Sequence, residues 1–139
     1  MDDPTPIAHR PMPEVLSVMI ADMMYRDPTT RKLFILGSFS AYAAREFPTV
    51  IRSLFVHIAV TGIHASVELD VRVVNAAETI TLITGKGRLK VPDPRVVAEI
   101  EMQLPPLTVA EAGDYRIQIW SGSTLLTTRR LMVLERKAK

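Results

Sequence analysis

The chain has 139 residues, of which 47% are apolar and 23% are charged. This length and composition indicate one globular domain and exclude a disordered chain. Cysteine is absent, which excludes disulfides, thiolate metal sites and a cysteine nucleophile, and the three histidines leave little for metal or acid–base chemistry.

The net charge of +2 hides an uneven distribution of charge. Residues 129–139 hold five cationic side chains beside the single acid Glu135, so the rest of the chain is slightly acidic. A cationic end could touch a phosphate backbone, which makes weak nucleic-acid binding through this basic C-terminal tail one candidate function. The simpler interpretation is a solvated terminus, because short charge runs commonly do no more than solvate.

The sequence carries no signal for a membrane. No stretch approaches the roughly 18 apolar residues that a membrane helix needs. The start, residues 1–4, is acidic and interrupted by proline, whereas a secretory signal has a positive end followed by an apolar run. We therefore expect a cytoplasmic protein without a membrane partner.

Most of the chain follows the two-residue period of β-strands. Residues 1–13 contain four prolines and are expected to form an extended leader. Apolar residues then alternate along eight segments separated by turn residues, at about 14–22, 32–39, 50–61, 65–74, 78–91, 95–104, 114–120 and 124–134. The odd-numbered residues 67–73 are expected to face inward in the fourth of them, and the even-numbered residues from Val96 to Leu104 in the sixth. Residues 40–48 fit either one or two helical turns or an extended continuation of the second strand. Eight short strands predict an antiparallel β-sandwich over residues 14–135, followed by a basic tail at 136–139.

One of these segments, at 78–91, changes phase. Ile80 and Leu82 are even-numbered, whereas Leu89 and Val91 are odd-numbered. A slip of one residue moves every later side chain to the other face, unless a bulge or turn resets the register. We expect a bulge or a small hairpin at residues 85–87, where two glycines lie.

The segment around Tyr115 resembles the tyrosine corner of immunoglobulin-like sandwiches. Glu111, Gly113 and Tyr115 have the spacing of that motif, in which the phenol tucks under the preceding loop and bonds its backbone. The position of the usual second cysteine is Ile117. The resemblance therefore implies a disulfide-free, immunoglobulin-like architecture.

The chain from about residue 14 also resembles an uncharacterised bacterial family known as a domain of unknown function. The matching landmarks are Ile20-Ala21-Asp22, residues 34–39, Phe47-Pro48, residues 104–107 and residues 113–116. This resemblance implies a β-sandwich and brings no activity or catalytic residues with it.

Three polar residues are the best candidates for chemistry. His57 and His64 are seven residues apart near the ends of adjoining strands, but no cysteine or evident acid completes a metal site, which needs three or four ligands. His57 is out of phase with Val56 and Ile58, so an exposed outer position explains it more simply. Asp22 follows an apolar strand and could be catalytic, although turn-capping carboxylates are far commoner.

Three further features could support recognition. Residues 85–90 place three cations near flexible backbone, which could bind an anion. A strand bulge is the simpler explanation for the two glycines in this segment. Trp120, beside the turn at 121–123, could be a recognition anchor or could pack against a sheet. Arg45-Glu46 beside Phe47 could form a recognition edge or an idle ion pair.

Together these observations favour a non-enzymatic binding or protein-interaction module without a metal, a cofactor or catalytic residues. The alternative from another class is an enzyme of unidentified type that uses Asp22, His57 and His64. We also expect a homodimer, because an open sandwich has edge strands and the first strand, between Val15 and Ala21, has neither charge nor proline to protect its edge. The alternative is that the leader at 1–13 or the segment at 40–48 folds over this edge within one chain.

Overall fold

The computed structural model describes residues 12–137, and all the regular structure in that part is β-strand. The predicted leader at 1–13 lies outside the described residues except for its last two, as do residues 138–139 of the predicted tail. The strands are β1 (Glu14–Arg26), β2 (Leu33–Ser38), β3 (Ala41–Ala44), β4 (Thr49–Ile51), β5 (Leu54–Thr61), β6 (Ser66–Val74), β7 (Thr81–Lys90), β8 (Ala98–Leu104), β9 (Leu107–Val109), β10 (Gly113–Ser121) and β11 (Thr124–Glu135).

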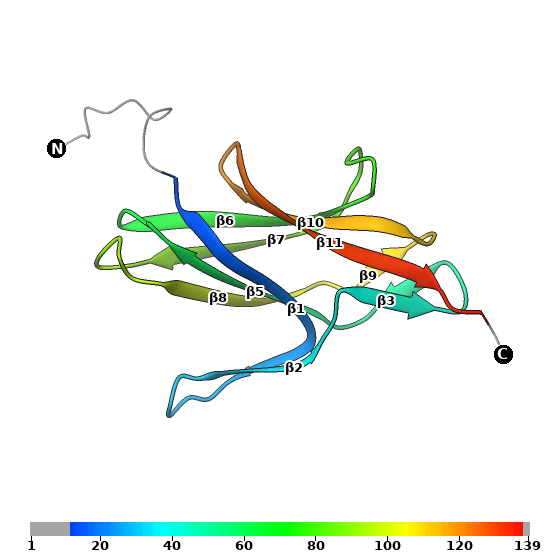
Figure 1. Ribbon diagram of the computed structural model, residues 1–139, viewed down its shortest axis with the longest axis horizontal. Helices are drawn as coiled ribbons and strands as arrows, with labels where there is room; N and C mark the ends of the chain where they lie inside the picture. Colours follow the sequence, from blue (N-terminus) through cyan, green and yellow to red (C-terminus); the bar gives the residue numbers. More distant parts are fainter. Residues whose placement is uncertain (1–11, 138–139) are drawn as a thin grey trace.

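The strands form two main layers that face each other (Figure 1). One sheet has the order β2-β1-β5-β8, the other has the order β3-β11-β10-β6-β7, and β4 and β9 form a small third pair. All these pairs are antiparallel except β3 with β11, which run parallel from Met132–Ala41 to Glu135–Ala44. The prediction of a wholly antiparallel fold is therefore wrong at this edge, where β3 continues the chain after β2 and joins the second sheet.

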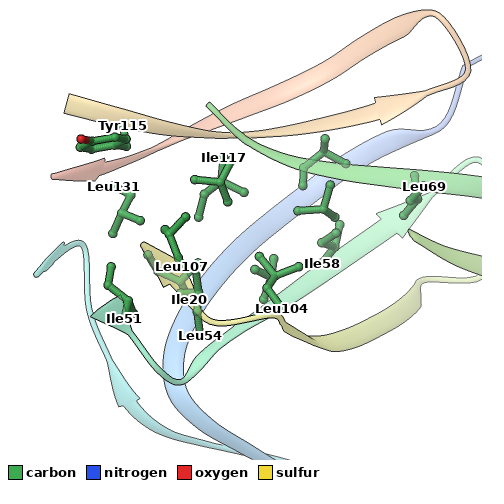
Figure 2. Packing of buried hydrophobic residues seen from close by; sticks show 14 of the residues in the cluster. Ile20, Ile51, Leu54, Ile58, Leu69, Leu104, Leu107, Tyr115, Ile117 and Leu131 are labelled. Carbon is green, nitrogen blue, oxygen red and sulfur yellow. The ribbon is translucent and has the colours of Figure 1, made fainter. Parts of the chain in front are cut away.

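The core lies between the two main sheets. Ile20 and Ile58 from the first sheet and Ile117 and Leu131 from the second are fully buried and point into one cluster (Figure 2). The predicted inward phase of residues 67–73 is confirmed, since the odd-numbered side chains of β6 pack in this cluster. This is the burial pattern of strands with one face in the core.

The structure has more strands than the eight expected. Residues 40–48 contain strand β3 and no helix. The predicted strand at 50–61 is interrupted at residues 52–53, which separate β4 from β5. Strand β9 was not predicted, because only three residues follow Pro105-Pro106 before the next turn. Val96, expected to face inward, is 38% exposed because β8 begins two residues later.

The phase change in β7 is a bulge, as predicted, but it lies elsewhere. Val74 pairs with Thr81 and Val73 pairs with Ile83, so Leu82 is the extra residue. The strand continues unbroken through Gly85, Lys86 and Gly87, and the predicted alternative of a hairpin there is wrong.

The two glycines of β7 allow a close approach between the main sheets. A Cβ atom built on Gly85 would lie 2.7 Å from Cδ2 of Leu104 and 3.1 Å from the sulfur of Met102. A Cβ atom on Gly87 would collide with the end of the Ile100 side chain. Side chains of β8 therefore occupy the space that any other residue at these positions would need.

The predicted contact of Tyr115 is confirmed. Its side chain is 6% exposed, and its hydroxyl donates a hydrogen bond of 2.7 Å to the backbone carbonyl of Glu111. The ring lies at the edge of the core cluster, with its oxygen turned away from the apolar side chains (Figure 2). The phenol thus ties the loop before β10 to the sheet.

Tyr115→Phe is expected to lower the free energy of unfolding by about 0.5–1.5 kcal/mol, the usual net value of one hydrogen bond. The reason is that the Glu111 carbonyl would lose its partner while the ring would still fill its place. A urea titration compared with wild type measures the effect. An unchanged midpoint would show that water replaces the hydroxyl at no cost.

Candidate interaction surface

A β-hairpin projects from the layered body and carries the most unusual surface of the described chain. Strand β1 pairs with β5 from Glu14 to Ala21 and with β2 from Ala21 to Arg26, so its second half extends beyond β5. We call residues 21–38 the arm; Figure 1 shows it at the bottom of the molecule, with its turn at the lower left.

The turn of the arm is well organised by Asp27. Its carboxylate accepts hydrogen bonds from the Thr29 backbone N–H at 2.9 Å and the Thr30 hydroxyl at 3.0 Å, and these bonds lower its pKa. The Asp27 backbone N–H in turn donates to the Lys32 carbonyl at 2.9 Å. Asp side chains bonded to backbone two residues on are typical turn formers, so the arm has a defined tip.

One side of the arm faces solvent and is apolar. Met23 pairs with Leu36 and Tyr25 pairs with Phe34 across the two strands. The exposed fractions of Met23, Tyr25, Phe34 and Leu36 are 53%, 54%, 51% and 52%, and the two aromatic rings lie 6.3 Å apart between centroids. Single exposed apolar residues are ordinary, but four that adjoin one another mark an interaction surface. We call these four residues the apolar face.

The opposite side of the arm faces the outer surface of β5 and β8. Met24 is buried, and its partner Ile35 and the next residue pair, Arg26 and Leu33, are half-buried. The guanidinium of Arg26 donates two hydrogen bonds of 2.7 Å to the two carboxylate oxygens of Glu101 on β8. This bidentate pair fixes the turn end of the arm to β8, because both geometry and charge favour it.

Beside this ion pair lies a second polar contact. His57 of β5 is 6% exposed, and its Nε2 atom lies 2.9 Å from Oε1 of Glu99. The Nδ1 atom of His57 is buried and has no hydrogen-bond partner in the structure. A cleft of about 270 Å³ adjoins the cluster and is lined in part by Arg26, Glu99 and Glu101.

The Arg26–Glu101 pair shifts the pKa values of both side chains. The hydrogen bonds from Arg26 lower the pKa of Glu101 below its ordinary 4.5, and the same bonds raise the pKa of Arg26. A carboxyl group whose folded pKa is depressed adds stability above its unfolded pKa and loses it as the pH falls through the folded value. The contribution of this pair is therefore present at neutral pH, begins to weaken as the pH falls below about 4.5, and is lost as the pH falls through the lower pKa of the folded state.

Glu101→Gln is accordingly expected to destabilise the protein by about 1 kcal/mol at pH 7, where a charge-assisted bond is lost, and by progressively less as the pH falls below about 4.5. Denaturation midpoints of wild type and variant between pH 3 and 7 measure the difference. A difference independent of pH would contradict an electrostatic role for the pair.

Strand β2 also leaves its backbone open. It is the last strand of its sheet and pairs with β1 alone. The outer edge of β2 carries neither a charge nor a proline between Leu33 and Ser38, which are the usual protections of an edge strand. The apolar face and an unprotected edge therefore occur on the same hairpin.

The edge that was expected to be open, on the first part of β1, is partly closed within the chain. The backbone N–H of Phe39 donates to the Ile20 carbonyl at 3.1 Å, and the Arg129 guanidinium donates to the Val18 carbonyl at 2.6 Å. The unprotected edge is thus β2 rather than residues 15–21.

The structure does not bring the predicted chemical residues together. His57 lies in the middle of β5, paired with Met19 and Glu101, while His64 is exposed in the loop after β5. His57 lies out of phase with the core residues Val56 and Ile58, as predicted, but its side chain is buried there and not exposed. Within residues 12–137, no three His, Asp or Glu side chains are grouped so as to hold a metal ion.

Asp22 does not cap a turn. It lies where β1 leaves β5, and its carboxylate covers Gly37, where a built Cβ would be 2.7 Å from Oδ2. Gly37 has a φ of 70°, which suits glycine, so the two residues shape the start of the arm. Arg45 and Glu46 are exposed beside the half-buried Phe47.

The cationic segment 85–90 is a regular strand. Two of its three cations face an acidic residue across the sheet, beside a hollow of about 390 Å³: Lys86 is paired with Asp70 and Arg88 with Glu68, whereas Lys90 is paired with Ser66. Trp120 is half-buried on the same sheet; the Arg72 guanidinium lies 4.7 Å from its ring centroid.

The basic tail is less free than its charge suggests. Arg129 belongs to β11, faces the other sheet and bonds Val18 and Ser40. The strand continues to Glu135, and the Arg136 backbone N–H donates to the Ala44 carbonyl at 2.7 Å. Fewer cations are therefore available for a phosphate backbone than the sequence suggested.

Sequence reasoning missed the apolar face. The predicted strand at 14–22 stops before Met23. The signal that could have extended it is the run of large apolar residues at 23–25, which resumes at Leu33.

Comparison with known families identifies the chain. The model of DUF6941, a family of unknown function, matches residues 16–134, which is most of the chain. The protein therefore belongs to this family. A search of curated proteins finds no match. No helix long and apolar enough to cross a membrane occurs among residues 12–137.

Proposed function

We propose that this member of DUF6941 is a non-enzymatic protein-interaction module that binds through the apolar face of its arm. The observation that carries the proposal is the group of four cross-strand neighbours, Met23, Tyr25, Phe34 and Leu36, each about half exposed. Large apolar side chains kept in water cost solubility and add little to folding, so their grouping favours a role in binding.

The rest of the arm supports this role because it holds the face still. The bidentate Arg26–Glu101 pair and the buried Met24 fix the arm from the other side. A surface that is ordered before binding loses less conformational freedom when a partner arrives. The simplest partner is a second copy, since twofold dimers are the commonest closed assemblies.

The other candidate functions have weaker support. The enzyme hypothesis needs Asp22, His57 and His64 to act together, and they lie on separate parts of the fold. The nucleic-acid hypothesis needs the basic tail, in which Arg129 already bonds Val18.

Three finer statements belong to the proposal. An immunoglobulin-like sandwich is supported by the two facing sheets and by the Tyr115 contact, as in domains with a tyrosine corner. A bacterial source is supported by the family resemblance, and a cytoplasmic location by the cysteine-free composition.

Light scattering at several concentrations tests the proposal. Wild type is expected to reach twice its chain mass of 15.5 kDa in the high micromolar range, and Phe34→Lys should keep the single-chain mass at every concentration. Ile80→Lys is the matched control, because Ile80 is 58% exposed but lies outside the arm, and it should associate like wild type. A wild type that stays at 15.5 kDa would refute self-association.

A further inference from the structure

We infer that two copies of the chain join through their β2 strands, which pair antiparallel and continue the β2-β1-β5-β8 sheet from one copy into the other. This inference rests on the proposed function and specifies its partner and geometry. It goes beyond an apolar contact, because it assigns the backbone edge of β2 as half of the interface.

The first step is that β2 offers an edge suited to another strand. Among residues 12–137, its backbone pairs with β1 alone, from Leu33 to Ser38. An edge strand without charge or proline is a template for further pairing. The arm is drawn below the two layers of the body (Figure 1).

The second step is that the edge is self-complementary. In a twofold antiparallel pair centred on Ile35, Phe34 lies opposite Leu36 of the second copy, and this contact occurs twice. Directly opposed residues of antiparallel strands point to the same face of the sheet. The two apolar faces would therefore merge into one surface of eight side chains, flanked by Tyr25 and Met23 of each copy.

The third step compares the area with what a dimer needs. Edge pairing places the two apolar faces side by side in one sheet, so their outer surfaces stay in water, and only the flanks of Phe34 and Leu36 and the paired backbone are buried. The contact is therefore smaller than the roughly 1,200 Å² of a specific interface. The arm thus predicts a weak dimer, held by backbone hydrogen bonds and by the two Phe34–Leu36 contacts.

The absence of cysteine makes this register directly testable. In the proposed pair, Lys32 lies opposite Ser38 of the second copy, with Cα atoms about 5 Å apart. Lys32 of one copy and Lys32 of the other lie six positions apart along the paired strands, or about 20 Å. The same separation applies to the two copies of Ser38. Both side chains are exposed and neither belongs to the apolar face.

The experiment uses two full-length variants, Lys32→Cys and Ser38→Cys, and a thiol cross-linker no longer than one strand spacing, about 5 Å. A mixture of the two at high micromolar concentration is expected to give a covalent dimer, while each variant alone should give at least tenfold less. Thermal melts of both variants establish that they are folded. Adding Phe34→Lys to both chains should abolish the cross-link.

The outcomes separate this inference from the proposed function. Association by light scattering without a cross-link in the mixture would overturn the β2 pairing and leave the interaction module standing. Equal cross-linking of each variant alone would overturn the register. A protein that is monomeric at all concentrations would overturn both.

Discussion

Ile117→Ala is expected to lower the free energy of unfolding by about 2–5 kcal/mol, the range for removing a large aliphatic side chain from a packed core. Ile117 is fully buried in β10, the strand between β11 and β6. Its side chain points into the middle of the cluster that both main sheets share (Figure 2). The backbone around it is paired on both sides, so the site has little freedom to collapse into the space left by the deletion.

Urea denaturation of wild type, Ile117→Ala and Ile117→Val measures this effect, and the valine variant should lose only about 0.5–1.5 kcal/mol. The comparison matters because Ile117 stands where the resemblance places the second cysteine of a disulfide. In this cysteine-free chain, side-chain packing must stabilise the contact between the two sheets that a disulfide stabilises in other sandwiches. If the free energy of unfolding of the alanine variant lies within about 0.5 kcal/mol of the wild-type value, packing at position 117 does not stabilise the sandwich.

The sequence was sufficient for the strands whose one face is buried. The alternation of β6 fixed its inward residues, and the Glu111-Gly113-Tyr115 spacing predicted a hydrogen bond that the structure contains. It was insufficient where pairing is decided by distant partners. No local pattern could show that β3 leaves the first sheet and runs parallel to β11, because that choice depends on residues ninety positions away.

The candidate site escaped sequence analysis for a related reason. Residues 23–25 and 33–36 are apolar on both faces, and such a run cannot tell which face meets the body and which meets solvent. Only the pairing of β1 with β5 as far as Ala21 shows that the later residues extend past the body. For His57 the phase correctly placed the side chain outside the core. It could not show that the side chain is buried there, beside Glu99.

Gly85→Ala is expected to destabilise the protein by about 1–3 kcal/mol, the usual cost of overpacking a core. In most strands the same change would help, because alanine loses less conformational freedom than glycine on folding. Here the added Cβ would lie 2.7 Å from Cδ2 of Leu104, whose side chain is 2% exposed and has no room to turn away. The collision therefore outweighs the entropic gain. Gly87→Ala should cost less, because the half-buried Ile100 that it meets can move toward solvent.

A double-mutant cycle assigns this cost to the contact with Leu104. Leu104→Ala alone should cost about 2–5 kcal/mol, because it leaves a cavity beside Gly85. In the double variant the new methyl group enters that cavity, so the two losses should fall short of additivity by at least about 0.5 kcal/mol. Equilibrium unfolding of the four proteins gives the coupling energy. Strict additivity would mean that Gly85 is required for its backbone rather than for the close approach of β7 and β8.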